Sequence, residues 1–166
     1  MDPEELEKAS YVLIRHGFSQ FNYKELIAKT EHGERSAAHI AVELDPLGMD
    51  PELHPAGIVQ CEAHQDELHK IDYKIVYTSP MQRCLMTTIH MFKNHPNKAN
   101  IKFVVLPFMR EVYSTTNDIA IDCFEMMEKF KEGSDMACGL NIDFSNMFMY
   151  GVPDLWQTYT IADLEK

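Results

Sequence analysis

The sequence has no apolar stretch that could cross a bilayer. Runs such as residues 103–108 are far shorter than the roughly 20 apolar residues that a membrane helix needs. Residues 1–10 are acidic and polar, so they lack the basic and apolar regions of a secretory signal peptide. These absences predict a soluble protein of the cytoplasm.

Positive charge is scarce as well. Fifteen basic residues stand against 26 acidic ones, which gives a formal net charge of −11 and a pI near 5.1. The overall field of such a chain repels a phosphate-coated polymer. We therefore expect no nucleic-acid and no membrane partner. A small anionic substrate can still bind through a few local cations and backbone donors.

Cysteine is present without the spacing of a metal module. There is no C-x-x-C pair, and no arrangement of cysteines matches a zinc site. In a chain without a secretory signal, free thiols are the simpler interpretation. The four cysteines are Cys61, Cys84, Cys123 and Cys138.

What is present is an ordinary globular composition, with 45% hydrophobic and 25% charged residues in a chain of 166. Short apolar runs typical of strands alternate with segments that carry helix-start signals. This alternation predicts an α/β fold around a mostly parallel sheet. The expected strands are residues 11–14, 74–77 and 101–106. The expected helices are residues 55–68, a segment from Ser79-Pro80 to 93, and 118–131, with a partly helical stretch over 19–44.

The tripeptide Arg15-His16-Gly17 follows the first expected strand, with Asn22 close behind. Neutral imidazole, whose ordinary pKa is about 6.5, can attack phosphorus at neutral pH. The planar fork of arginine matches two phosphate oxygens, and glycine lets the backbone approach a ligand closely. The alternative is a solvated turn that contains these residues by chance, since one tripeptide is weak evidence.

Two more side chains follow the second and third expected strands. Arg83 falls in the first turn of a helix, where a positive charge is unfavourable because it lies at the positive end of the helix dipole. An anion bound there would be attracted by both the arginine and the helix N-terminus, which makes the position favourable. Glu111 can act as a general acid if its pKa is raised. Taken singly, Arg83 can be a surface arginine and Glu111 a loop residue in a salt bridge. Because all three segments follow strands of one parallel sheet, we expect them to converge at one edge.

Together these segments resemble the histidine phosphatase superfamily, in its phosphoglycerate-mutase-like branch. Members open with a strand, then Arg-His-Gly and an asparagine five residues later. The family's D-P-x-L-x-x-x-G helix entry is similar to Asp50-Pro-Glu-Leu-His-Pro-Ala-Gly57, and its S-S-P-x-x-R segment looks like Thr78-Ser-Pro-Met-Gln-Arg83. The resemblance covers about residues 11–111. It implies a three-layer α/β sandwich.

The resemblance also implies an activity, a phosphomonoester hydrolase that works through a phosphohistidine without metal or another cofactor. His16 would carry the phosphoryl group and Glu111 would protonate the leaving group. The residues that would hold the substrate are Arg15, Arg83, Asn22, Gly17 and Ser19.

The expected substrate is a phosphorylated small molecule or a phosphoprotein, and phosphate or sulfate is expected to fit the pocket. Phe18 stands where many members carry glutamate, which favours hydrolysis over mutase chemistry.

The sequence departs from the family in one respect. Members need a second histidine on a later strand, but the last histidine here is His95, and none occurs in the 55 residues (166 − 111) after Glu111. In the family that strand lies between the strand before Arg-His-Gly and the strand before S-S-P. Without it, two rows of backbone donors and acceptors are left unpaired. We therefore expect a sheet completed by a C-terminal fragment or a partner chain. Thr160 can begin a helix that Lys166 cuts short, which favours a fragment.

We expect a single domain over residues 1–166 that is incomplete at the C-terminus. It would comprise an acidic lead-in at 1–10, a motif-bearing core at 11–111 and a substrate or cap region at 112–166. A rival hypothesis is a pseudophosphatase, in which the fold is kept as a binding or assembly module. A third, an unrelated α/β domain, predicts that the motif residues lie scattered over the surface.

Overall fold

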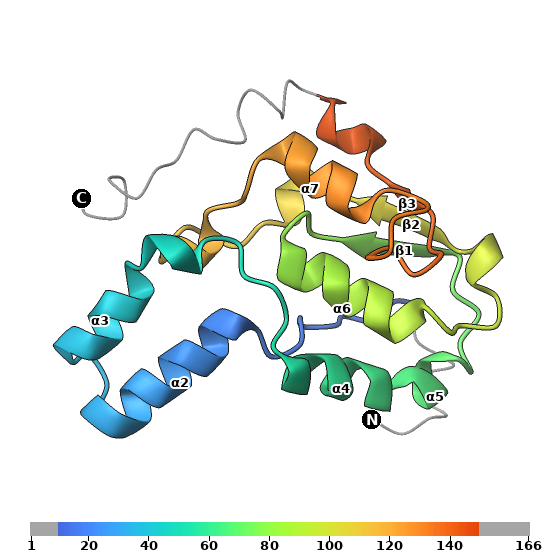
Figure 1. Ribbon diagram of the computed structural model, residues 1–166. Coiled ribbons are helices and arrows are strands. Elements are labelled where there is room, and N and C mark those ends of the chain that lie inside the picture. The colour runs from blue at the N-terminus through green and yellow to red at the C-terminus, as the bar shows by residue number, and fades with distance from the viewer. Residues whose placement is uncertain (1–9, 150–166) are drawn as a thin grey trace.

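The computed structural model describes residues 10–149 and contains a three-stranded parallel sheet (Figure 1). The strand order is β1 (Ile75–Thr78), β2 (Lys102–Val105), β3 (Ile142–Asp143). Ile75 is aligned with Lys102, and Phe103 with Ile142. The predictions of strands at 74–77 and 101–106 are confirmed. The two-residue strand β3 was not predicted.

The prediction of a buried strand at residues 11–14 is wrong. These residues pair with no strand, and Tyr11 and Leu13 are 77% and 86% exposed. A strand forms only beside a neighbour that accepts its hydrogen bonds. Among residues 10–149, β1 pairs with β2 alone, so residues 11–14 have no strand partner in the sheet.

Helix α6 (Gln82–Phe92) follows β1 and begins later than expected. Ser79 does not cap it; the N-cap is Met81, which has no capping side chain. Instead the carboxylate of Asp50, from a distant loop, accepts a hydrogen bond from the Gln82 backbone N–H at 2.8 Å. A residue 32 positions away therefore satisfies the first turn of this helix.

Other helices agree with the predictions in place more than in length. The stretch 19–44 forms α2 (Gln20–His32) and α3 (Ala37–Glu43), which project as a hairpin (Figure 1). The segment 55–68 is divided at His64 into α4 (Pro55–Ala63) and α5 (Gln65–Leu68). Helix α7 (Cys123–Phe130) starts five residues after the predicted Asp118, which lies in the 3-10 turn η4 (Thr116–Asp118). Further 3-10 turns are η1 (Pro46–Gly48), η2 (Lys98–Asn100), η3 (Pro107–Met109) and η5 (Ser145–Met147).

The sheet lies between α6 on one side and α7 on the other, with α4 and α5 beyond α6 (Figure 1). One buried cluster joins the layers, with Phe92 of α6, Phe103 of β2 and Phe130 of α7. The rings of Phe92 and Phe103 meet edge to face, with centroids 5.6 Å apart. The predicted α/β fold, with helices on both faces of a parallel sheet, is confirmed. Within the described part of the chain, no helix is long and apolar enough to span a membrane. The helix expected at Thr160 lies outside the described residues.

Candidate active site

The loop that carries His16 is fixed by close packing at Gly17. A Cβ on Gly17 would lie 2.8 Å from Sγ of Cys61 and 3.0 Å from the carbonyl oxygen of Gly57. The Gly17 N–H donates to Oγ1 of Thr87 at 2.9 Å, and that hydroxyl donates to the carbonyl of Arg83 at 2.7 Å. The loop is therefore tied to the first turns of α6, the helix that bears Arg83.

The ring of His16 is held in one tautomer. Its Nδ1 lies 2.8 Å from the carbonyl oxygen of Gly17, and a carbonyl can only accept, so Nδ1 carries the proton. Nε2 is left with a free lone pair. Burial lowers the pKa of His16 most, and the charges of Arg83 and Arg15 lower it further, against the Gly17 carbonyl and Glu111, which raise it. The imidazole is thus neutral and nucleophilic at neutral pH.

Arg83 is 1% exposed and bound on its terminal nitrogens only. Nη1 donates to the carbonyl of Asn117 at 2.7 Å, and Nη2 lies 3.2 Å from both Glu111 and Asp118. Nε is buried and has no partner among the described residues. An unpaired donor of a buried guanidinium is costly unless an anion completes it.

His16 lies between two hollows. The first, of about 860 Å³, has residues 10–16 and 71–79 along its walls and is also lined by Arg83 and Glu111. The second, of about 660 Å³, extends toward α2 and is lined by Asn22, Lys29 and Gln60. Arg15 lines both hollows, and it makes no ion pair with any residue of 10–149. The structure thus brings His16, Arg15, Arg83 and Glu111 together at one end of the sheet.

Asn22 and Ser19 are engaged with each other at the start of α2. The Ser19 hydroxyl accepts from the Asn22 backbone N–H at 3.1 Å, and Oδ1 of Asn22 accepts from the backbone N–H of Ser19 at 3.2 Å. This reciprocal capping box fixes the helix that leaves the His16 loop. Ser19 is buried, whereas Asn22 faces the second hollow.

Two buried carboxylates in this region were missed by sequence reasoning as functional residues. Asp118 pairs with Arg83, and Asp50 caps α6 one residue before Arg83. Burial raises the pKa of Asp50 to about 6. The T-x-x-D pattern of Thr115 and Asp118 could have predicted a capped turn but not a partner 35 residues away.

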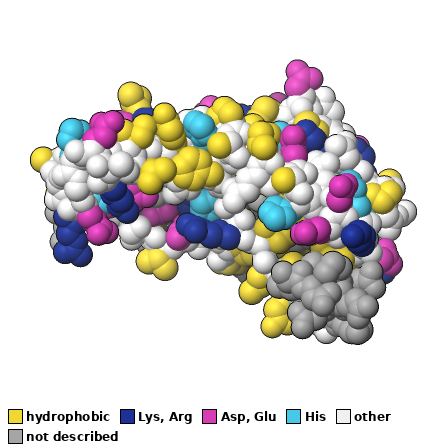
Figure 2. Space-filling model, turned by 90° about the horizontal axis from the view of Figure 1, so that it is seen from below, with side chains coloured by type: hydrophobic (Ala, Val, Ile, Leu, Met, Phe, Trp, Pro, Cys, Tyr) yellow, Lys and Arg dark blue, Asp and Glu magenta, His cyan; other side chains and the backbone are white. Residues whose placement is uncertain are grey.

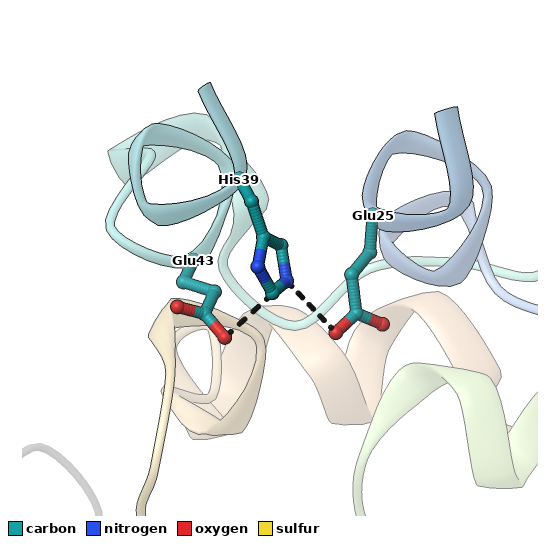
Figure 3. A group of neighbouring side chains, drawn as sticks. All are labelled: Glu25, His39 and Glu43. Carbon is teal, nitrogen blue, oxygen red and sulfur yellow. Dashed lines mark hydrogen bonds and ion pairs between the residues drawn. The ribbon is translucent and has the colours of Figure 1, made fainter. Parts of the chain in front are cut away.

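One group of side chains in the described part has the composition of a metal site, namely His39 with Glu25 and Glu43 (Figure 3). The buried Nε2 of His39 points between the two carboxylates, 3.5 Å from one and 3.6 Å from the other. Its Nδ1, however, accepts a hydrogen bond from the Arg35 backbone N–H at 3.0 Å. The neutral ring therefore carries its proton on Nε2, so this nitrogen is a donor toward the carboxylates and has no lone pair for a metal.

No second histidine joins the site within residues 10–149, because His16 is the one histidine that lines either hollow. His54 is the N-cap of α4; it accepts from the Ala56 N–H, and its ring stacks on that of Tyr23 with centroids 4.5 Å apart.

A family model matches residues 11–116 of the chain, that of the histidine phosphatase superfamily (branch 1). The chain belongs to this superfamily. The match contains His16, Arg15, Arg83 and Glu111, the residues that the fold gathers around the first hollow. A comparison with curated proteins finds no match. The histidine phosphatase region ends before Asp118, so the buried partner of Arg83 lies outside the matched residues.

Proposed function

We propose that this histidine phosphatase hydrolyses a phosphomonoester through a phosphohistidine on His16. The observation that carries the proposal is that two residues line one hollow: a histidine whose Nε2 has a free lone pair, and a buried arginine whose Nε–H has no partner among the described residues. The first is a nucleophile and the second is a donor for a phosphoryl oxygen.

In the first half of the reaction, Nε2 of His16 attacks phosphorus and the bond from phosphorus to the ester oxygen breaks. Glu111 gives its proton to the departing oxygen, while Arg15, Arg83 and Asn22 hold the other phosphoryl oxygens. In the second half, water attacks the phosphohistidine and the P–N bond breaks. Glu111 takes the proton from that water, and orthophosphate leaves.

The substrate that we propose is a phosphorylated small molecule or a phosphoprotein. Phe18 replaces the glutamate common at this position, which favours hydrolysis over transfer within a substrate. The net charge of −11 is unsuited to nucleic acid. In the view of Figure 2, basic side chains are scattered among acidic and apolar ones and form no continuous surface. A cytoplasmic location accords with the four free thiols.

We also propose that a further strand, from a C-terminal fragment or a partner chain, occupies the part of the first hollow between residues 10–15 and β1, away from Arg83 and Glu111. The carbonyls of Lys74 and Thr78 accept from β2, so the alternating residues Ile75 and Tyr77 turn their backbone groups to the hollow. Residues 10–15 face it with no backbone hydrogen bond to any described residue. In the chain alone, the Tyr77 amide should exchange with solvent much faster than that of Leu106, which donates to Thr78. Equal protection of the two amides would contradict an open edge.

A second candidate function is favoured by the lack of another histidine in either hollow. A pseudophosphatase would bind phosphate or a partner at this site without turning it over. Retention of His16, Arg83 and Glu111 at one sheet end supports the enzyme.

The deciding experiment is hydrolysis of p-nitrophenyl phosphate in the presence of EDTA by the purified chain. His16→Ala should abolish turnover together with an acid-labile phosphoenzyme. His32→Gln, which changes an exposed histidine of α2, is the matched control and should retain both. Turnover that persists in His16→Ala would refute the nucleophile. A folded chain without any turnover would favour the pseudophosphatase.

A further inference from the structure

The carboxylate of Asp118 is among the most enclosed charged groups in the described part of the chain. Its side chain is 2% exposed, as is that of Arg83, and the two lie 3.2 Å apart. Only one oxygen, Oδ1, contacts the guanidinium. The other, Oδ2, accepts from the backbone N–H and hydroxyl of Ser114 and from the backbone N–H of Thr115, at 3.0 to 3.2 Å. The position of Asp118 is therefore set by its own turn and not by Arg83.

The same turn holds the other end of the guanidinium, because the carbonyl of Asn117 accepts from Nη1. Both terminal nitrogens of Arg83 are thus bound to residues 117 and 118. Nε is buried and unpaired among residues 10–149, and the side chain lines the first hollow. A guanidinium has a fixed planar geometry, so binding one edge fixes the direction of the other.

Glu111 contacts the same Nη2 at the same distance of 3.2 Å but is 63% exposed on its side chain. An exposed carboxylate is held weakly and can leave the ion pair, whereas removing a buried partner leaves a charge uncompensated. Asp118 is therefore the permanent counter-ion of Arg83, and Glu111 is the exchangeable one.

We propose that Asp118 is a positioning residue of this site, with two effects that rest on the proposed phosphatase function. It fixes the plane of the Arg83 guanidinium in the wall of the first hollow, where the phosphoryl group would bind. It also satisfies the charge of Arg83, which leaves Glu111 free to carry a proton to the leaving group. Without Asp118, the guanidinium turns to Glu111 as its remaining carboxylate partner, and proton transfer suffers along with phosphate binding.

The first test is Asp118→Asn, which keeps the shape of the side chain and removes its charge. Binding of orthophosphate, measured by calorimetry on the full chain, should weaken roughly tenfold, the usual size of one charge-assisted hydrogen bond. Asp66→Asn, an exposed change on α5, is the matched control and should bind as the unsubstituted protein does. Unchanged phosphate binding in a folded Asp118→Asn protein overturns the proposed effect on Arg83.

The second test separates a positioning role from a general structural one. Hydrolysis of phenyl phosphate, which has a poor leaving group, should fall at least severalfold more than that of p-nitrophenyl phosphate in Asp118→Asn. When Asp118→Asn is added to a Glu111→Gln protein, it should slow the two substrates equally relative to Glu111→Gln alone, because no acid remains to be captured. Equal losses for the two substrates in Asp118→Asn overturn the proposed effect on Glu111.

Two outcomes would point elsewhere. If Asp118→Asn fails to fold, Ser114→Ala replaces it, because Ser114 is exposed and its hydroxyl donates one of the three bonds to Oδ2, while the two backbone donors remain. It should weaken phosphate binding in the same direction by a smaller factor, and unchanged binding overturns the proposal. If the unsubstituted chain binds no orthophosphate, the proposed function fails as well. If it binds orthophosphate and Asp118→Asn binds it equally, the positioning role alone fails.

Discussion

Gly57 of α4 lies against the backbone of Phe18 so closely that a Cβ on Gly57 would fall 2.1 Å from the Phe18 carbonyl oxygen. That carbonyl accepts from the His54 N–H at 2.9 Å, so the start of α4 is fastened to the loop two residues beyond His16. The glycine of the D-P-x-L-x-x-x-G segment therefore sets the distance between this helix and the His16 loop.

Gly57→Ala should accordingly displace the loop and lower both stability and activity. Because the obstructing atoms belong to backbone and cannot rotate away, we expect a loss of about 1–3 kcal/mol in the free energy of unfolding. Urea denaturation measures it. Ala63→Gly, at the exposed end of the same helix, should cost no more than ~1 kcal/mol. A Gly57→Ala protein as stable as the original would show that α4 can move away from Phe18.

Asp50 makes stability depend on pH in an unusual direction. Its carboxylate accepts hydrogen bonds from the backbone N–H of Gln82 at the start of α6 and from that of Ile121 just before α7, and both bonds favour the charged form. Desolvation outweighs them and raises its pKa from 3.8 to about 6. Between these values the folded chain binds more protons than the unfolded chain, so this contribution to stability falls as pH rises, by at most about 3 kcal/mol.

Asp50→Asn isolates that contribution. Asparagine also tolerates the positive φ of 37° at this position. Plotted from pH 3.5 to 7, the stability of the original chain relative to Asp50→Asn should decline with rising pH and level off above about pH 6. A relative stability that rises with pH would mean that the helix start, and not burial, sets the pKa of Asp50.

The residues that could be predicted are those whose neighbours along the chain define them. Strand β2 is flanked by a polar turn and Pro107, and the residues after β1 and β2 must converge because parallel strands end at one edge. Arg83 and Glu111 do meet, at 3.2 Å. In these cases, local pattern and sheet topology agree.

What escaped prediction depends on partners distant in sequence. The apolar run at 11–14 predicted burial, but a strand needs a neighbour, which no described residue supplies. The helix after β1 was expected to begin at Ser79-Pro80, yet it begins at Gln82, whose backbone N–H donates to Asp50, 32 positions away. Asp118 was placed at the start of a helix because no local signal reveals its bond to Arg83.

Arg83→Lys should show whether the fork geometry of Arg83 is needed. Lysine keeps the charge but cannot bind Asn117 and Asp118 while also offering a donor at the position of Nε. We expect kcat for p-nitrophenyl phosphate to fall on the order of 100-fold. Arg35→Lys, outside both hollows, is the matched control. Retained activity in Arg83→Lys would reduce the role of Arg83 to that of a point charge.

The acidic limb of the pH profile should report His16. Nucleophilic attack requires the neutral ring, so kcat/KM falls as pH drops through the pKa of His16. Because burial and the charges of Arg83 and Arg15 lower that pKa, the midpoint should lie below the ordinary value of 6.5. Arg15→Gln removes one of these charges and should move the midpoint upward, toward 6.5, while it raises KM through loss of a phosphate ligand.

A midpoint at or above 6.5 in the unsubstituted chain would mean that Glu111 and the Gly17 carbonyl dominate the titration, and that the ring is partly protonated when the substrate arrives. NMR titration of the His16 ring, with His32→Gln to help assign the signals, distinguishes this from a limb caused by another group.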